Sequence, residues 1–234
     1  MSKMIVVTGG SKGIGRAIIN KFAGIGKNVV VCARKLADLE SLKCEVEEVY
    51  NVTVHIFQAD VSNKEECLSF INYVNGLDED IEILVNNAGV FVPGSIHNED
   101  EGAFEMMMQT NMYSTYYITR GLINKMIEKK EGYIFNIASV ASFVAYANGG
   151  SYAISKHAML GFSRSLREEM KPYNVKVTSV MPGATYTNSW AGVDLPEERF
   201  IKSQDIADLV FSAYNLSNSA VVEDIIVRPQ LGDI

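Results

Sequence analysis

The sequence predicts an α/β protein with a seven-stranded, doubly wound parallel sheet and helices on both of its faces. Short runs rich in β-branched residues alternate along the chain with longer segments that carry apolar residues at helical spacing. This alternation is typical of consecutive strand–helix units, whose strands pair in parallel. The 234 residues contain no internal repeat, low-complexity tract or Pro/Ser-rich linker, so we expect residues 1–234 to form one domain.

The expected elements follow one another without a break in the pattern. The strands are expected, in chain order, at 5–8, 29–32, 52–57, 81–86, 133–138, 175–181 and 225–227. The helices expected between them cover residues 13–25, 36–49, 63–75, 103–128, 152–170 and 204–214. Residues 184–203, which include Trp190, Gly192 and Pro196, form the one long irregular connection. Loops of this length in compact domains are usually functional or mobile.

The composition argues against several classes of protein. A net charge of −7 at pH 7 argues against nucleic-acid binding, which usually needs a basic surface. The chain starts without the basic segment, apolar stretch and cleavage site of a signal peptide. The charge-free stretch 132–155 holds too many polar residues to span a membrane. We therefore expect neither a nucleic-acid nor a membrane partner.

The cysteines and histidines suggest no metal centre. Neither a disulfide framework nor a zinc site is indicated, and a reducing cytoplasm is expected, because no C-x-x-C pair occurs among Cys32, Cys44 and Cys67. No metal-like or triad arrangement is formed by His55, His97 and His157. We assign no metal ligand.

A glycine-rich turn follows the first expected strand. Residues 8–15 read Thr-Gly-Gly-Ser-Lys-Gly-Ile-Gly and lead into a segment with helical apolar spacing. Glycines allow close backbone approach, and the N–H groups of a helix N-terminus attract phosphate. The turn therefore predicts a seat for the pyrophosphate of a dinucleotide. A tight strand-to-helix turn without a ligand is the simpler alternative.

Tyr152 and Lys156 are spaced for cooperation. Side chains four residues apart project from the same face of a helix. A tyrosine with an ordinary pKa near 10 is a poor acid–base group at neutral pH, and a nearby ammonium stabilises its phenolate. An exposed Tyr/Lys pair without function is the alternative.

The ordered set of motifs resembles the short-chain dehydrogenase/reductase family, with similarity to its 3-oxoacyl-acyl-carrier-protein reductase-like members. The turn matches T-G-x-x-x-G-x-G, and the other matches, in order, are Asp60, Asn86-Asn87-Ala88-Gly89, Asn111, Ser139, Tyr152-x-x-x-Lys156 and Pro182-Gly183. The resemblance implies a single Rossmann-type domain with a substrate loop at about 184–203. It covers nearly the whole chain.

The resemblance also implies the residues that hold an NAD(P) cofactor. These are Gly9, Ser11, Lys12, Gly13, Ile14 and Gly15 at the phosphates, Arg34, Asp60 and Val61, Asn87, Ala88 and Gly89 at the adenosine side, and Tyr152, Lys156, Pro182, Gly183 and Thr187 at the nicotinamide side. A local structural role is the alternative for several of them: Asp60 could cap a loop, Pro182-Gly183 could end a strand and Thr187 could be an exposed hydroxyl.

The end of the second strand predicts a preference for NADP(H) over NAD(H). Ala33 stands where NAD-preferring members of the family carry Asp, and Arg34 and Lys12 could approach a 2′-phosphate. Guanidinium suits such a contact particularly well. Two solvated surface charges are the alternative.

By the same resemblance, the reaction is reduction of a ketone or aldehyde, with a 3-oxoacyl thioester among the candidates. Tyr152 would be the general acid/base, Ser139 would bind the carbonyl oxygen, Lys156 would bind ribose and stabilise the phenolate, and Asn111 would hold a water in the proton relay. Two departures are Ser142, where the family often has Gly, and residues 226–230, which lack the frequent D-G-G ending.

Partners and competing functions complete the expectations. A homodimer or homotetramer is expected from the family and from a helix–helix contact filled by Met106, Met107, Met108 and Met112. Binding of acyl-carrier protein has weak support from Lys129-Lys130, which would have to lie near the mouth of the site. A solvated helix end is the alternative for these two lysines. The alternative function is an NADP(H)-binding regulatory or sensor protein, against which the intact Tyr152/Lys156 pair argues. A sugar-nucleotide epimerase is disfavoured because no substrate domain follows residue 200.

Overall fold

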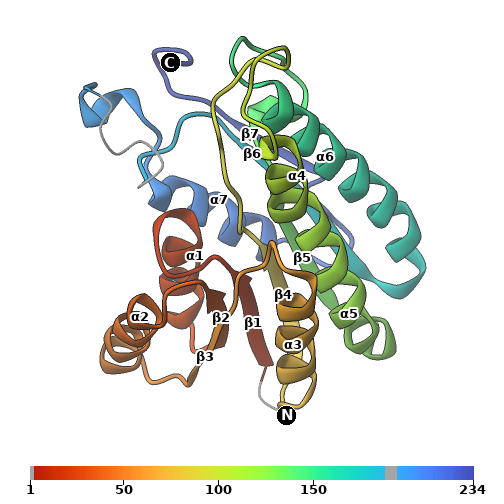
Figure 1. The fold of residues 1–234 in the computed structure, drawn as a ribbon. Coiled ribbons are helices and arrows are strands. Elements are labelled where there is room, and N and C mark those ends of the chain that lie inside the picture. Colours follow the sequence, from red (N-terminus) through yellow and green to blue (C-terminus); the bar gives the residue numbers. More distant parts are fainter. Residues whose placement is uncertain (1–2, 188–193) are drawn as a thin grey trace.

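The computed structural model describes residues 3–187 and 194–234, and all seven strands in it belong to one parallel sheet (Figure 1). The strands are β1 (Lys3–Thr8), β2 (Asn28–Ala33), β3 (Val54–Gln58), β4 (Asp80–Asn86), β5 (Gly132–Ile137), β6 (Val175–Pro182) and β7 (Asp224–Val227). They are ordered β3-β2-β1-β4-β5-β6-β7, so the winding reverses between β1 and β4. The predicted fold class is confirmed, and each strand bound lies within two residues of its predicted place.

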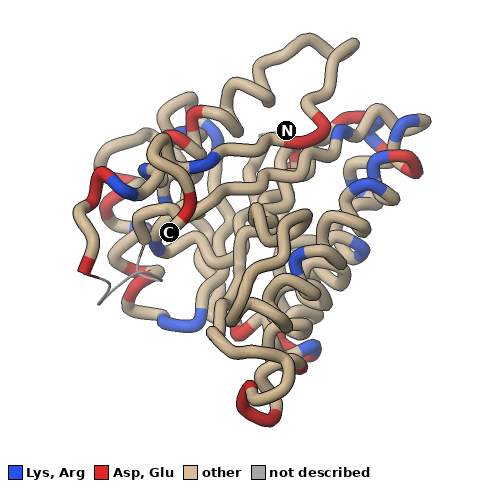
Figure 2. The backbone as a smooth tube through the Cα atoms, turned by 90° about the horizontal axis from the view of Figure 1, so that it is seen from above, with Lys and Arg blue, Asp and Glu red and all other residues tan. Residues whose placement is uncertain are grey.

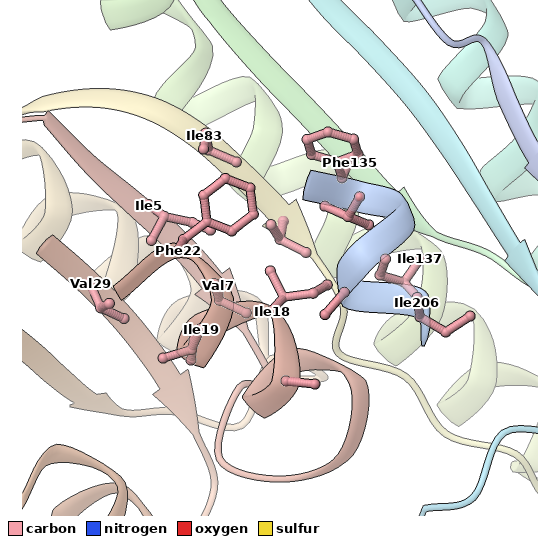
Figure 3. Close-up of a cluster of buried hydrophobic side chains, with 14 of the residues drawn as sticks. Ile5, Val7, Ile18, Ile19, Phe22, Val29, Ile83, Phe135, Ile137 and Ile206 are labelled. Carbon is pink, nitrogen blue, oxygen red and sulfur yellow. The ribbon is translucent and has the colours of Figure 1, made fainter. Parts of the chain in front are cut away.

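Helices cover both faces of the sheet. They are α1 (Gly13–Ala23), α2 (Leu36–Val49), α3 (Lys64–Asn75), α4 (Ala103–Met108), α5 (Ser114–Lys129), α6 (Gly150–Met170) and α7 (Ser203–Tyr214). Alternation along β1 separates the two cores, because successive strand side chains point to opposite faces. Ile5 and Val7 pack with α1, α2 and α7 (Figure 3), whereas Met4 and Val6 pack with α3, α5 and α6.

The predicted helix 103–128 is wrong in one respect, since it is interrupted. Between α4 and α5 lies a π-helical turn, η1 (Gln109–Tyr113). Of the methionines expected to fill a helix–helix contact, Met107 is fully buried, Met112 packs against a small internal cluster, and Met106 is 40% exposed. Short 3₁₀ turns complete the fold at η2 (Val140–Ser142), η3 (Lys171–Tyr173) and η5 (Glu197–Arg199).

The loops that leave the carboxyl ends of the strands gather at the top of Figure 1. There the segment after β4 pairs with the segment before α6 through a bridge between Gly94 and Gly149. Figure 2 views this edge from above, and charged residues lie mostly around its rim. Of the predicted loop 184–203, Trp190 and Gly192 lie outside the described residues, and Thr185 bridges to Ile201. Within the described chain, we find no helix long and apolar enough to cross a bilayer.

Candidate active site

The turn after β1 requires glycine for two reasons, its backbone conformation and its close packing against the end of β4. Gly9 and Gly13 have φ values of +64° and +56°, in the left-handed region that side chains rarely adopt. A Cβ atom on Gly9 would lie 2.9 Å from the Cα of Ala88, and one on Gly15 would lie 2.5 Å from Nδ2 of Asn87. The first turn of α1 carries no acidic residue. Lys12 is the N-cap residue of this helix, and its side chain forms no capping hydrogen bond with the N–H groups of the first turn. These free N–H groups suit an anionic ligand.

Asn87 and Thr8 fasten this turn to the end of β4. The amide nitrogen Nδ2 of Asn87 donates to the carbonyl oxygens of Thr8 and Gly9, at 3.0 and 2.9 Å. In return, the Thr8 hydroxyl accepts hydrogen bonds from the backbone N–H groups of Asn87 and Ala88, at 3.0 and 3.1 Å. Thr8 is absent from our predicted site residues, although it opens the glycine motif. The two strands beside the switch point therefore position the turn together.

Asp60 and Val61 follow β3 at the same edge of the sheet. One carboxylate oxygen of Asp60 accepts from the N–H and the hydroxyl of Ser62, at 3.0 and 2.7 Å. The carbonyl oxygen of Val61 accepts from the thiol of Cys67 at 3.1 Å. Asp60 thus stabilises its own loop, which is the capping role that we considered as the alternative to cofactor binding.

The basic residues near the end of β2 differ in their partners. The ammonium of Lys12 lies 2.8 Å from a carboxylate oxygen of Asp38, in the first turn of α2. Arg34 is exposed, and its guanidinium has no ion pair among residues 3–187 and 194–234. Sequence reasoning missed Asp38, for which the signal was an acidic residue where a helix N-terminus favours one. A 2′-phosphate at this place would compete with Asp38 for Lys12.

The first turns of α6 carry Tyr152 and Lys156. Lys156 is only 4% exposed, and its ammonium donates to the carbonyl oxygen of Ile137 at 2.9 Å and lies 5.7 Å from the centre of the Tyr152 ring. Burial lowers the pKa of Lys156 to about 8. Burial also raises the pKa of Tyr152 to about 12, and a hydrogen bond with Ser139 acts in the opposite direction. Both groups are thus held in an environment that disfavours their charged forms.

Ser139 lies at the end of β5, held by its own turn. Its hydroxyl oxygen accepts from the N–H of Ala141 at 3.1 Å, and its N–H donates to the hydroxyl of Ser142 at 3.3 Å. The two serines therefore form a reciprocal cap on η2. Ser142, which departs from the family pattern, is 1% exposed and helps to hold the Ser139 turn.

Asn111 lies in the π turn η1 and joins two segments of the site. Its side-chain oxygen accepts from the N–H of Val90 at 2.8 Å, and its Nδ2 donates to the carbonyl oxygen of Val90 at 3.0 Å and to the Ser155 hydroxyl at 2.9 Å. Ser155 in turn donates to the carbonyl oxygen of Tyr152 at 2.7 Å. Asn111 thus connects the loop after β4 with the helix that carries Tyr152. π turns inside helices are frequent at functional sites.

The residues after β6 lie against the glycine turn and the C-terminal tail. A Cβ atom on Gly13 would lie 3.0 Å from a methyl carbon of Thr187. Gly183, which follows Pro182, donates to the carbonyl oxygen of Val227 at 2.8 Å and lies against Pro229. The tail itself is held by an ion pair between Arg228 and Asp233.

Lys129-Lys130 does not lie near this site. It ends α5 immediately before β5, at the edge of the sheet where the strands begin, and Lys129 pairs with Asp80 at 3.1 Å. The suggestion that these lysines dock acyl-carrier protein near the mouth of the site is therefore wrong. In the described ranges, we also find no group of His, Cys, Asp and Glu that could hold a metal.

Known proteins resemble this chain along nearly its full length. Residues 3–198 match the model of the short chain dehydrogenase family. A sepiapterin reductase of Chlorobaculum tepidum is 35% identical over 100% of this chain and 99% of its own. A 3-oxoacyl-[acyl-carrier-protein] reductase of Aquifex aeolicus is 29% identical over 89% of this chain and 88% of its own.

Among solved structures, a metagenomic short-chain oxidoreductase in complex with NADP superimposes with a TM-score of 0.85. It is 28% identical and covers 98% of both chains. Taken with the glycine turn and with Ser139, Tyr152 and Lys156 at one edge of the sheet, these similarities show that the chain belongs to the short-chain dehydrogenase family.

Proposed function

We propose that this NAD(P)-dependent oxidoreductase uses NADPH to reduce a ketone or aldehyde to an alcohol, with Tyr152 as the proton donor. The observation that carries the proposal is the partly buried Tyr152 phenol, hydrogen-bonded to Ser139 and beside the buried ammonium of Lys156. The cofactor residues Gly9, Gly13 and Gly15 fit a dinucleotide, since they leave no room for side chains and lead into the uncapped start of α1.

NADPH, when bound, would supply the hydride that the carbonyl carbon receives. Ser139 hydrogen-bonds the carbonyl oxygen and orients it, while the Tyr152 phenol transfers its proton to that oxygen. Lys156 stabilises the phenolate that remains and would also bind the ribose of the cofactor. The products are an alcohol, oxidised cofactor and a phenolate that is reprotonated from solvent.

Arg34 and Lys12 support a preference for NADPH over NADH. Arg34 is exposed and unpaired within the described ranges, and Ala33 puts no carboxylate at the end of β2. A related structure holds NADP. Comparable kcat/KM values with NADPH and NADH would contradict this preference.

The decisive experiment measures NADPH oxidation with a panel of diketones, ketoesters, quinones, aldehydes and acyl thioesters. Sepiapterin belongs in the panel, since one relative is named as its reductase. Turnover of at least one carbonyl compound supports the proposal. If NADPH binds but no carbonyl compound is reduced, the sensor alternative replaces it.

A homodimer or homotetramer is part of the proposal. The continuous segment of α4, η1 and α5 exposes large apolar side chains at Phe104, Met106, Tyr113 and Tyr116. Such exposed patches mark contact surfaces. Light scattering at micromolar concentration tests this, and a monomer would count against it. A cytoplasmic location fits the three free cysteines.

A further inference from the structure

We infer that Asn148 is a site of spontaneous deamidation and, resting on the proposed function, that its conversion to isoaspartate slows carbonyl reduction. Two asparagines of the chain precede a glycine, Asn75 and Asn148. Asparagine is a chemically labile residue, and a following glycine has no Cβ atom to hinder attack of its backbone nitrogen on the asparagine side chain. The structure treats the two sites differently.

Asn75 is protected by α3, of which it is the last residue. The N–H group of Gly76 donates to the carbonyl oxygens of Asn72 and Tyr73, at 3.0 and 3.1 Å. The side-chain amide of Asn75 donates to the carbonyl oxygen of Gly121 at 3.1 Å. Both reacting groups would have to leave these hydrogen bonds before they could meet. Asn75 therefore serves as an internal control.

Asn148 lacks this protection. It is exposed, and Gly149 is the N-cap residue of α6, whose N–H group takes no part in the hydrogen bonds of that helix. The hydroxyl of Ser95 donates to Oδ1 of Asn148 at 2.8 Å. This bond polarises the side-chain carbonyl and stabilises the oxyanion that forms when a nucleophile adds to its carbon. The surroundings of Asn148 thus favour the reaction.

The reaction needs only water as a co-reactant. The backbone nitrogen of Gly149 gives up its proton and bonds to Cγ of Asn148, while the Cγ–Nδ2 bond breaks and Nδ2 leaves as ammonia. Water then opens the cyclic imide at one of its two carbonyl carbons. Opening at the backbone carbonyl gives isoaspartate, and opening at Cγ gives aspartate. Both products gain a carboxylate, and isoaspartate also lengthens the backbone by one methylene group.

The ring of Tyr146 limits the rate. A Cβ atom on Gly149 would lie 2.5 Å from this ring, so the ring covers the glycine backbone. Tyr146 is itself 45% exposed, and exposed side chains change rotamer rapidly, so the cover opens without unfolding. Tyr146→Ala should therefore speed the modification, whereas Ser95→Ala should slow it.

The backbone at Asn148 joins two parts of the site. Its carbonyl oxygen accepts from the N–H group of Gly94 at 3.0 Å, in the bridge between the loop after β4 and the segment before α6. The same loop carries Phe91, whose ring packs edge to face on Tyr152, with ring centres 5.0 Å apart and an angle of 71°. Isoaspartate takes the residue 148 carbonyl out of this bridge. We therefore expect Tyr152 to lose its fixed position and kcat to fall several-fold.

The test incubates the full chain at mildly alkaline pH in water labelled with heavy oxygen, and peptide mass spectrometry follows both sites. We expect Asn148 to be modified about tenfold faster than Asn75 or more, and turnover to fall in step with isoaspartate. Asn148→Gly has no side chain to react and accommodates the left-handed backbone (φ +59°), so it should keep its activity through the incubation. Asn148→Asp adds the carboxylate alone and should change kcat by less than about twofold.

The outcomes separate this inference from the proposed function. Equal rates of modification at Asn75 and Asn148, or no modification of Asn148 in Tyr146→Ala, would overturn the inference. So would a loss of activity in Asn148→Gly as fast as in the wild type. The modification is measured without a substrate, so failure of the proposed function is seen separately, as absence of NADPH oxidation by fresh protein with every carbonyl compound.

Discussion

The hydroxyl of Ser151 donates a hydrogen bond to the carboxylate of Glu99, and Ser151 is the residue immediately before Tyr152. Glu99 belongs to the segment that precedes α4, whereas Ser151 lies in the first turn of α6 and is 1% exposed. A carboxylate near the N-terminus of a long helix is favourable because the helix dipole is positive there. The bond therefore ties the loop after β4 to the helix that carries Tyr152.

Ser151→Ala leaves the Glu99 carboxylate without this donor. We expect the free energy of unfolding to fall by about 1–3 kcal/mol and kcat to fall several-fold, while NADPH affinity stays within about twofold. Urea denaturation and steady-state kinetics measure both effects. Ser95→Ala breaks an exposed bond in the same loop and should cost less than 1 kcal/mol or so. Equal effects of the two substitutions would argue against a special role of the Glu99 contact.

Tyr152→Phe keeps the ring and its contact with Phe91 but removes the proton. We expect kcat to fall by about 10²–10⁴, the usual scale for general acid–base catalysis, with NADPH binding retained. Fluorescence titration of NADPH and turnover measurements test the two halves separately. Near-normal turnover would show that Tyr152 is not the proton donor.

Lys156 makes stability depend on pH. Its pKa is lowered to about 8 from 10.5 by burial, so between these values the unfolded chain binds a proton that the folded chain does not. Stability therefore rises with pH across this window. Lys156→Met lacks this titrating group, so its stability should not show this rise. The difference in free energy of unfolding, variant minus wild type, should therefore fall by on the order of 2–3 kcal/mol between pH 7 and pH 10.

Denaturation at several pH values measures this difference, and Lys171→Met, at a lysine whose side chain is 57% exposed, is the matched control. Alcohol oxidation gives a second readout of the same variant. Tyr152 must be deprotonated in that direction, so loss of the ammonium should move the rise in rate to higher pH. An unchanged profile would remove Lys156 from the proton-transfer step.

Gly15→Ala should weaken NADPH binding by tenfold or more. The added Cβ atom would lie 2.5 Å from Nδ2 of Asn87 and 2.9 Å from the Cα of Gly10, so the backbone of the glycine turn must shift. Gly161→Ala in α6 adds a Cβ atom with no described atom within 4 Å, apart from its chain neighbours and its own helix backbone, and should leave NADPH affinity unchanged. Titration calorimetry compares them, and equal affinities would contradict the assigned turn.

Asp38→Asn frees Lys12 from its ion pair. Because Lys12 then needs no exchange of partner to meet a 2′-phosphate, we expect the ratio of kcat/KM for NADPH over NADH to rise several-fold. Arg34→Asp should lower or reverse the same ratio. A rise in NADH and NADPH efficiency by equal factors would show that Asp38 does not act on the phosphate.

The sheet could be predicted because its signals are local. Each strand is a short apolar run, and each crossover carries its own helical spacing. The π turn at Asn111 could not, because it accompanies hydrogen bonds to Val90 and Ser155, which are distant in sequence. The Asp38 partner of Lys12 and the position of Lys129-Lys130 at the opposite edge likewise depend on how the elements are arranged in space. The sequence motifs predicted which residues belong to the site. The contacts between those residues could be identified only from the three-dimensional structure.

The order of the strands also constrains how the chain can be made. β1 is synthesised before β2 and β4, yet it lies between them in the sheet. β2, one neighbour of β1, follows β1 after a single crossover, whereas β4, its other neighbour, begins only at Asp80. A nascent chain that ends at α3 therefore carries a buried-type apolar strand with one unpaired edge, which is a template for pairing with other chains. Aggregation during synthesis or refolding should depend on how soon β4 pairs with the free edge of β1, and not on the stability of the finished sheet.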